Sequence, residues 1–246
     1  MSGINRNIAV GGILALLVAI IVIWGLFFTR EAPPDFSQYP AGVERKEAFF
    51  SYFAPIMQEV NTDILAQRDR IEKRCNDGED SYTAFSDLAE TYRIDESTLT
   101  DGSVCDVLLE HIDIVPVSLA LAQAANESAW GTSRFAQEGN NFFGQWCFKK
   151  GCGIVPGSRD TGKNHEVATF DSPAESVESY MLNLNRHNAY EPLRDIRSQL
   201  RVREEPITGI KLTHGLNRYS ERGEEYGKEL RGMILYNKLN EYENTL

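Results

Sequence analysis

The sequence predicts a mainly helical protein with one small β-hairpin, preceded by a transmembrane helix. Apolar residues recur at spacings of three and four residues over most of the chain after residue 43, which is the period of a helix with one buried face. Residues 151–170 form the one stretch whose short β-branched runs flank a glycine-containing turn, which favours a hairpin. Residues 8–28 are apolar throughout. With 246 residues, the chain has room for one sizeable domain and some extra segments.

The apolar run Ile8–Phe28 is 21 residues long and contains no charged side chain. About 20 such residues span a bilayer. A cleaved signal peptide would have a shorter apolar core followed by small residues, whereas this run ends in Phe27 and Phe28. We therefore expect an uncleaved signal anchor at 8–28, after a short cytoplasmic N-terminus at 1–7. A proline-rich linker at 29–42 follows it.

Four cysteines follow the apolar run: Cys75, Cys105, Cys147 and Cys152. An even number of cysteines in a translocated domain suggests two disulfides. Cys147–Cys152 would close a short loop and Cys75–Cys105 would join two helical segments, but four cysteines permit three pairings, and four buried thiols are the alternative. We expect no metal, because the sequence has no cysteine and histidine cluster with the spacing of zinc ligands.

The charge of the chain argues against nucleic acid as a partner. Residues 1–28 contain Arg6 and no acidic residue, so 24 basic and 36 acidic residues remain beyond them, a net charge of −12. Nucleic-acid binding needs clustered lysine and arginine. No Gly-x-Gly-x-x-Gly or Walker A motif is present either, so we expect no nucleotide and no cofactor. The helical spacing of Arg194, Arg197 and Arg201 predicts a solvated, salt-bridged face.

Helices are predicted on both sides of the hairpin. The first, Arg45–Cys75, contains Pro55 and should be kinked or split there. Ser172 begins another helix, with Pro173 and Glu175 in a capping box. The remaining predicted helices are Tyr82–Tyr92, Leu99–His111, Tyr190–Val202, Ile207–Leu216 and Glu224–Tyr242.

The most informative helix runs from Pro116 to Trp130, is apolar all round, and should end at Gly131. It carries one carboxylate, Glu127, in its last turn. Burial and the negative end of the helix dipole both disfavour an anion there, so the pKa of Glu127 should be raised. A carboxylic acid that stays protonated near neutral pH can act as a general acid. The alternative is that Glu127 caps a neighbouring backbone or pairs with Arg134.

The run AANESAWGTSRFA followed by NNFFGQW resembles the signature of the family 73 glycoside hydrolases, a family of glucosaminidases with a lysozyme-like, two-lobed fold. The similarity extends from about Pro116 to Tyr226. It implies that residues 113–246 form the catalytic domain and that residues 43–112 are a helical region packed on it. It also implies that Glu127 is the catalytic acid and that peptidoglycan is the substrate. Residues near the acid would line the sugar cleft: Ser128, Trp130, Asn141, Phe143, Gly144 and Trp146.

The second catalytic group is where this sequence departs from the family pattern. Family members usually carry another Glu on the first strand of the hairpin, but residues 153–160 contain none. Asp160, near the turn, and Glu166, on the return strand, are the candidates for a base, and a solvated strand edge is the alternative for Glu166. The substrate's own acetamido group can also replace a second carboxylate. The family's active-site tyrosine matches Tyr219, and Tyr226 should pack on the last helix.

The resemblance implies an endo-β-N-acetylglucosaminidase. The apolar run at 8–28 and the even number of cysteines beyond it add the expectation that the protein is held in the inner membrane, with its catalytic domain in the periplasm. A lytic transglycosylase or muramidase could use the same cleft with a single acid, because a fold does not determine the bond that is cut. A non-catalytic peptidoglycan-binding protein is the alternative from another class, and the missing first-strand Glu motivates it.

Overall fold

The computed structural model describes residues 32–99, 103–157, 162 and 164–245, and Pro34–Leu246 form one compact unit. The expected anchor at 8–28 lies outside the described residues. Within the described part of the chain, no helix has the length and apolar character needed to cross a membrane. The helices are α2 (Val43–Asn76), α3 (Ser86–Tyr92), α4 (Val104–His111), α5 (Val117–Glu127), α6 (Arg134–Gly139), α7 (Pro173–Arg186), α8 (Glu191–Val202), α9 (Gly209–Leu212) and α10 (Glu224–Tyr236).

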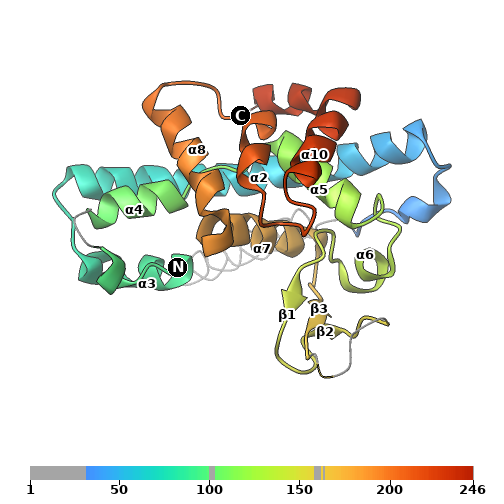
Figure 1. The fold of residues 1–246 in the computed structure, drawn as a ribbon, viewed down its shortest axis with the longest axis horizontal. Helices are drawn as coiled ribbons and strands as arrows, with labels where there is room; N and C mark the ends of the chain where they lie inside the picture. The colour runs from blue at the N-terminus through green and yellow to red at the C-terminus, as the bar shows by residue number, and fades with distance from the viewer. Residues whose placement is uncertain (1–31, 100–102, 158–161, 163, 246) are drawn as a thin grey trace, which may run out of the picture. The chain divides into compact units, whose positions relative to one another are not determined.

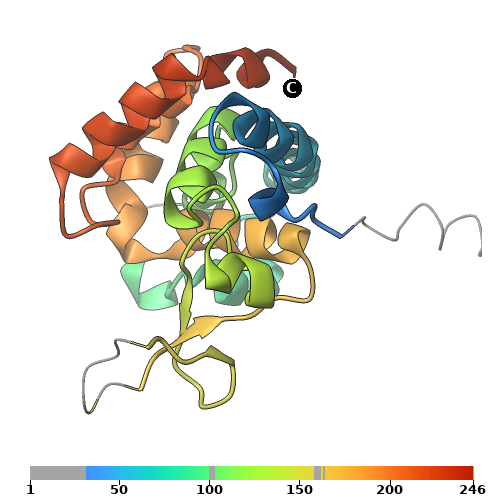
Figure 2. The same cartoon turned by 90° about the vertical axis from the view of Figure 1, so that its right-hand side faces the viewer.

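Helix α5 is the centre of this unit. It contacts α2, α9, α10 and the 3-10 helix η6 (Leu239–Thr245), and Figures 1 and 2 both show it between α2 and α10. Its residues from Val117 to Ala125 are all buried. The expected apolar helix is thus confirmed, and its burial comes from neighbours on every side. A buried central helix gives the residue at its end, Glu127, a fixed position.

Helix α2 joins two apolar clusters. Its first half, with Phe49, Phe53 and Met57, belongs to the main core around α5. Ile71 belongs to a second cluster with residues of α3 and α4, and a disulfide between Cys75 and Cys105 ties α2 to α4 there. The helix continues through Pro55, so the alternative of a split at that residue is wrong. The predicted Cys75–Cys105 pairing is confirmed.

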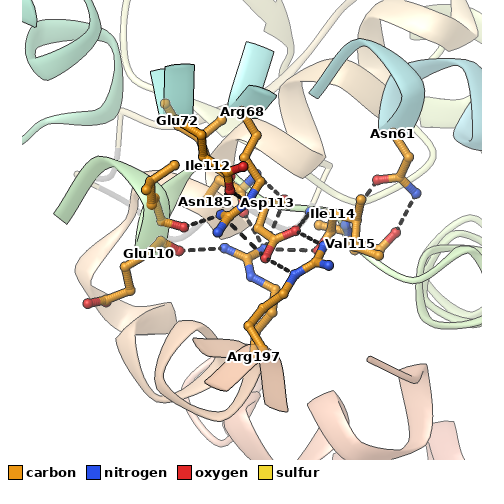
Figure 3. Close-up of polar contacts among 12 residues, drawn as sticks. Asn61, Arg68, Glu72, Glu110, Ile112, Asp113, Ile114, Val115, Asn185 and Arg197 are labelled. Atoms are coloured by element: carbon orange, nitrogen blue, oxygen red, sulfur yellow. Dashed lines mark hydrogen bonds and ion pairs between the residues drawn. The ribbon is translucent and has the colours of Figure 1, made fainter. Parts of the chain in front are cut away.

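A buried polar cluster fixes the segment that leads into α5 (Figure 3). Arg197 of α8, whose side chain is 1% exposed, donates to the carbonyls of Glu110, His111, Asp113 and Ile114 and to the side-chain oxygen of Asn185. From the other side, the Asn61 amide of α2 exchanges two hydrogen bonds with the backbone of Val115. These bonds supply donors to backbone carbonyls that lie outside regular structure, and the Asn185 amide is a second donor to the carbonyl of Asp113.

The prediction of a solvated arginine face on α8 is therefore wrong for two of its three residues. Arg194 is 3% exposed, and its guanidinium donates to the carbonyls of Leu184 and His187. Only Arg201 is half-exposed, and it forms two hydrogen bonds with the carboxylate of Asp113. Helical spacing placed these arginines on one face correctly, but that face packs against backbone carbonyls of another segment.

The β region is a three-stranded antiparallel sheet in the order β1-β3-β2, beyond α6 in Figure 1. The strands are β1 (Trp146–Cys147), β2 (Gly153–Ile154) and β3 (Glu166–Ala168). Gly153 is required, because a Cβ there would lie 1.9 Å from the carbonyl oxygen of Val167. The predicted hairpin corresponds to β2 and β3 and is confirmed. Strand β1 was not predicted, because it is too short to show an alternating pattern.

Candidate functional site

Helix α5 ends at Glu127, earlier than the expected end at Trp130. Ala129, Trp130 and Gly131 all have positive φ angles of 51° to 75°, so the chain turns sharply directly after the acid. Ser128 supports this turn, since its hydroxyl donates to the carbonyl of Ala124 and accepts from the amide of Gly131. Glycine is required at position 131 for two reasons. Its positive φ favours glycine, and a Cβ there would lie 2.3 Å from the ring of Phe36.

The hydroxyl of Tyr226, on α10, donates a hydrogen bond of 2.9 Å to Oε1 of Glu127. Tyr226 is buried on α10, so it packs there as expected, and its hydroxyl contacts the acid in addition. Arg134, the alternative partner of Glu127, instead donates to the carbonyl of Val155. Glu127 is thus held by a neutral donor, and the structure gives it no arginine partner among the described residues.

A second residue of α5 orients the Tyr226 hydroxyl. The side-chain amide of Gln123, one helical turn before Glu127, donates to the Tyr226 oxygen at 3.1 Å. The Gln123 oxygen in turn accepts from the hydroxyl of Tyr180, on α7, at 2.6 Å. Because the Tyr226 oxygen accepts from Gln123, its own proton points to Glu127.

Tyr219 contacts the ring of Tyr226 and makes no hydrogen bond to Glu127 among the described contacts. The two rings stack with centroids 5.3 Å apart, and the Tyr219 hydroxyl donates to the carbonyl of Phe143 at 3.2 Å. The ring of Phe143 stacks on Tyr180, with centroids 3.9 Å apart. The structure therefore brings Tyr219 to the site as expected, but it makes Tyr226, and not Tyr219, the tyrosine that contacts the acid.

Burial raises the pKa of Glu127, as predicted from the sequence, and the nearby charge of Glu229 acts in the same direction. The Tyr226 hydrogen bond favours the ionised form and limits this rise. Burial, and then the charge of Glu127, raise the pKa of Tyr226 far above its ordinary value. Tyr226 is thus a neutral donor at any physiological pH. The site pairs one partly buried carboxyl with one permanently protonated phenol.

The open side of Glu127 faces Gly144. This glycine is exposed and has a φ of +64°, and a Cβ there would lie 3.7 Å from Oε2 of Glu127. Oε1 of Glu127 thus accepts from Tyr226, while Oε2 lies beside an exposed stretch of backbone. The side chain of Asn126 is a further hydrogen-bond partner of the carboxyl. Gly144 lies where the sequence analysis expected it, next to the acid.

Three expected sugar contacts are instead buried parts of the scaffold. Ser128, Asn141 and Phe143 are each at most 3% exposed. The Asn141 amide donates to the carbonyls of Gln145 and Ala168, while its oxygen accepts from the amides of Phe143 and Gln145. Asn141 and Phe143 thus build the turn that places Gly144 beside Glu127, and Ser128 builds the turn after α5. Contact of these three side chains with a sugar stays a prediction.

The two tryptophans expected at the site differ in their surroundings. Trp130 packs on α2, edge-on to Phe49 and Phe50, with the ammonium group of Lys46 5.0 Å from its ring centre. Trp146 is 59% exposed and stacks on His165 with ring centres 4.2 Å apart. An aromatic face of this kind suits the C–H faces of sugars. Contact of either tryptophan with a substrate stays a prediction.

Glu166 has a structural task in the sheet. It is 5% exposed and lies opposite Cys147, and its carboxylate accepts hydrogen bonds from the amides of Gly151 and Gly153. The predicted Cys147–Cys152 disulfide is confirmed. Although the sulfurs and the Glu166 carboxylate lie within 4.8 Å of one another, oxidised sulfurs are poor metal ligands. Asp160, the other candidate base, lies outside the described residues.

Sequence reasoning missed Gln123 as a site residue. The signal was available, because Gln123 precedes Glu127 by four residues in a helix otherwise built from apolar and small side chains. Residues four apart lie on the same face of a helix. A buried polar side chain on the same face as the acid should have been expected to need a partner there.

Comparison with known proteins assigns this site to a family. Residues 105–239 match the family model Glucosaminidase, described as mannosyl-glycoprotein endo-beta-N-acetylglucosaminidase. The chain belongs to the glucosaminidase family. Its glucosaminidase domain includes Gln123, Glu127 and Tyr226, so the site lies within the matched residues. Membership of this family makes the protein a glycoside hydrolase by class.

Two known proteins are similar to the chain over most of its length. Protein bax of Escherichia coli strain K12 is 36% identical over 208 residues, which cover 83% of this chain and 74% of that protein. The catalytic domain of the autolysin Auto from Listeria monocytogenes superposes with a TM-score of 0.46 at 17% identity, covering 84% of this chain and 92% of that domain.

Proposed function

We propose that this protein is an endo-β-N-acetylglucosaminidase that cuts the glycan strands of peptidoglycan, with Glu127 as the general acid. The observation that carries the proposal is the environment of Glu127. It is a partly buried carboxyl with a raised pKa, held by a neutral donor and open on one side. Family membership supplies the class of bond, a glycosidic bond next to N-acetylglucosamine.

The hydrogen bonds suggest which carboxyl oxygen carries the proton. Oε1 accepts from Tyr226, so the proton of neutral Glu127 belongs on Oε2, beside Gly144. From Oε2 it would pass to the glycosidic oxygen as the bond to the anomeric carbon breaks. Oε1 would then carry the new negative charge, which the Tyr226 hydroxyl stabilises. Gln123 acts as a positioning residue, because it fixes the direction of that hydroxyl.

The second catalytic group is proposed to be the substrate's own acetamido oxygen. Glu166 is unsuited to the role of base, because its carboxylate holds two backbone amides of the sheet. Attack of the acetamido carbonyl on the anomeric carbon would leave the protein with only one carboxyl to supply. Asp160 remains the alternative base, and Asp160→Asn tests it. Substrate assistance predicts that this variant keeps most of its activity.

The proposed location is the outer face of the inner membrane, with residues 8–28 as the anchor. The apolar run and its bulky end support an uncleaved anchor. The two disulfides support an oxidising compartment for the remainder of the chain. Protease added to spheroplasts should digest residues 43–246 of the full chain, and alkaline carbonate should leave the protein in the membrane fraction. Protection from protease would contradict the orientation.

The deciding experiment is digestion of purified peptidoglycan by the detergent-solubilised full chain, beside Glu127→Gln, with mass analysis of the released ends. We expect reducing N-acetylglucosamine ends from the wild type and a loss of about 100- to 10,000-fold in the variant, the usual contribution of a general acid. Ends with 1,6-anhydromuramic acid would instead identify a lytic transglycosylase. If both proteins bind peptidoglycan and release nothing, the protein is a binding module.

A further inference from the structure

The loop between β1 and β2, Phe148–Gly151, differs in character from the rest of the chain. We call it the tip loop. Phe148 is 75% exposed, and Lys149 and Lys150 beside it are exposed as well. Figure 1 shows the sheet that carries it extending away from the helices. Trp146 and Val155, on the strands and loops next to it, are also exposed large apolar side chains, and exposed apolar patches mark interaction sites.

The tip loop is exposed yet held at several points. The Cys147–Cys152 disulfide closes it at its base, and the amide of Cys152 donates to the carbonyl of Lys149 at 3.1 Å. The buried carboxylate of Glu166 accepts from the amide of Gly151 inside the loop and from that of Gly153 beyond it. A loop ordered in advance loses little conformational entropy when it binds a ligand. An exposed loop that is held by a disulfide and by hydrogen bonds is typical of a binding element.

The charge of the tip loop is opposite to that of the chain. The chain has a net charge of −11, whereas the tip loop contains two adjacent lysines and no acidic residue. Neither lysine has an ion-pair partner within the part of the chain that the structure describes. A local positive charge attracts anionic ligands even where the net charge of the protein is negative.

We propose that the tip loop binds the carboxylate groups of the peptide stems carried by the glycan strand, with Lys149 and Lys150 as the cationic contacts. The inference rests on the proposed function, since it takes peptidoglycan as the substrate. The aromatic faces of Phe148 and the neighbouring Trp146 suit the apolar parts of the same strand. The tip loop thereby selects glycan strands that still bear anionic stems.

The test measures binding in the Glu127→Gln background, so that cleavage does not alter the ligand. Co-sedimentation is measured with intact peptidoglycan sacculi and with sacculi whose carboxylates have been converted to amides by carbodiimide and ammonia. The key variant is Lys149→Gln/Lys150→Gln. The control is Lys73→Gln/Lys238→Gln, which removes the same charge from exposed positions on α2 and after α10. All four lysines are exposed, so none of these substitutions disturbs the core.

We expect intact sacculi to bind about 2- to 10-fold more tightly than amidated sacculi, the range for two exposed ion pairs. The tip-loop variant should lose this preference, while the control keeps it. The preference should also weaken with added salt. Equal loss of binding to both kinds of sacculi, or no loss, would overturn the proposal. So would stronger tip-loop-dependent binding to phosphatidylglycerol vesicles than to sacculi, which would make a lipid surface the ligand.

The outcome separates this inference from the proposed function. If the wild type cuts sacculi but the tip-loop variant shows no change in binding preference, the glucosaminidase assignment stands and the stem-binding inference fails. If the wild type releases no sugar while the tip-loop variant still loses its preference for intact sacculi, the binding inference stands and the enzymatic assignment fails.

Discussion

Tyr226 and Glu127 are 99 residues apart in the chain and lie 2.9 Å from each other, hydroxyl oxygen to carboxyl oxygen. The bond joins the end of α5 to the start of α10, and it uses only one of the two carboxyl oxygens. It also lowers the pKa of Glu127 against the larger effect of burial, which raises it. Tyr226 therefore orients the carboxyl group of Glu127 and limits the rise of its pKa.

Tyr226→Phe should lower kcat/KM by about 10- to 100-fold, the effect of losing one hydrogen bond to a charged group. Because that bond lowers the pKa of Glu127, its removal should also move the alkaline limb of the pH profile to higher pH. Tyr219→Phe is the matched control, since it removes a hydroxyl from the same stacked pair without touching Glu127. A larger loss in Tyr219→Phe, with a shifted pH profile, would restore Tyr219 as the catalytic tyrosine.

Glu127→Gln should make the folded protein more stable at pH 7 while it lowers activity about 100- to 10,000-fold. The folded-state pKa of Glu127 is raised, so ionisation as the pH rises costs the folded state more than the unfolded state. Thermal unfolding should show a higher Tm for the variant at pH 7, and the difference should shrink as the pH falls below the ordinary pKa of 4.5. An equal Tm at pH 7 would show that burial of this carboxyl costs nothing.

His111 should contribute to the loss of stability in acid. Burial, followed by the charge of Arg194, lowers its pKa from 6.5 to about 4. Between these values the unfolded state binds a proton that the folded state does not, so stability falls as the pH falls, by at most about 3 kcal/mol. His111→Gln removes the titration and keeps a donor for the carbonyl of Val107. Urea titrations at pH 7 and pH 4 should show a smaller acid loss in this variant than in the wild type.

Arg197→Lys should destabilise the protein by about 3 kcal/mol, although it keeps the charge. An ammonium group cannot reproduce the planar fork that serves four carbonyls and Asn185, and buried acceptors left without donors are costly. Arg203→Lys, at an exposed position at the end of the same helix, is the control and should change stability by less than about 0.5 kcal/mol. Similar denaturation midpoints for the two variants would contradict the structural role of Arg197.

Glu166→Gln should test whether this residue acts in catalysis or in the sheet. If its carboxylate only holds the amides of Gly151 and Gly153, activity should fall less than about tenfold and the shape of the pH profile should stay unchanged. A loss as large as that of Glu127→Gln, with one limb of the profile missing, would identify Glu166 as the base.

Most helices could be predicted, because they depend on patterns that are local in the sequence. The even number of cysteines indicated two disulfides, but it left three pairings open, and the structure decides among them. The central helix, its acid and the raised pKa of Glu127 followed from an apolar run that ends in a carboxylate. The partners of the acid did not follow in the same way. Whether Tyr219 or Tyr226 reaches Glu127 depends on the path of the chain between residues 216 and 224, which consists of turns and has no regular pattern to predict.

Burial of polar side chains was the other source of error. Ser128, Asn141 and Arg197 are of residue types that are mostly exposed. The family resemblance implied sugar contact for Ser128 and Asn141, and helical spacing predicted a solvated Arg197. Each is buried because it supplies hydrogen bonds to a backbone segment that has no regular partner. Sequence spacing identifies which side chains share a face, but it does not indicate that a distant irregular segment will need them.

Helix α2 also determines which of its faces contacts each of the two apolar clusters. Its 34 residues present Phe53 and Met57 to one cluster and Ile71 to the other from a single rigid rod. An insertion of one residue between Val60 and Ile71 would rotate the far half by about 100° and turn Ile71 away from its neighbours. Seven added residues, close to two full turns, would restore the facing but displace the far half by about 10 Å. The spacing within this helix is therefore as constrained as the residues of the site, whereas the loops of the sheet can change in length without disturbing either cluster.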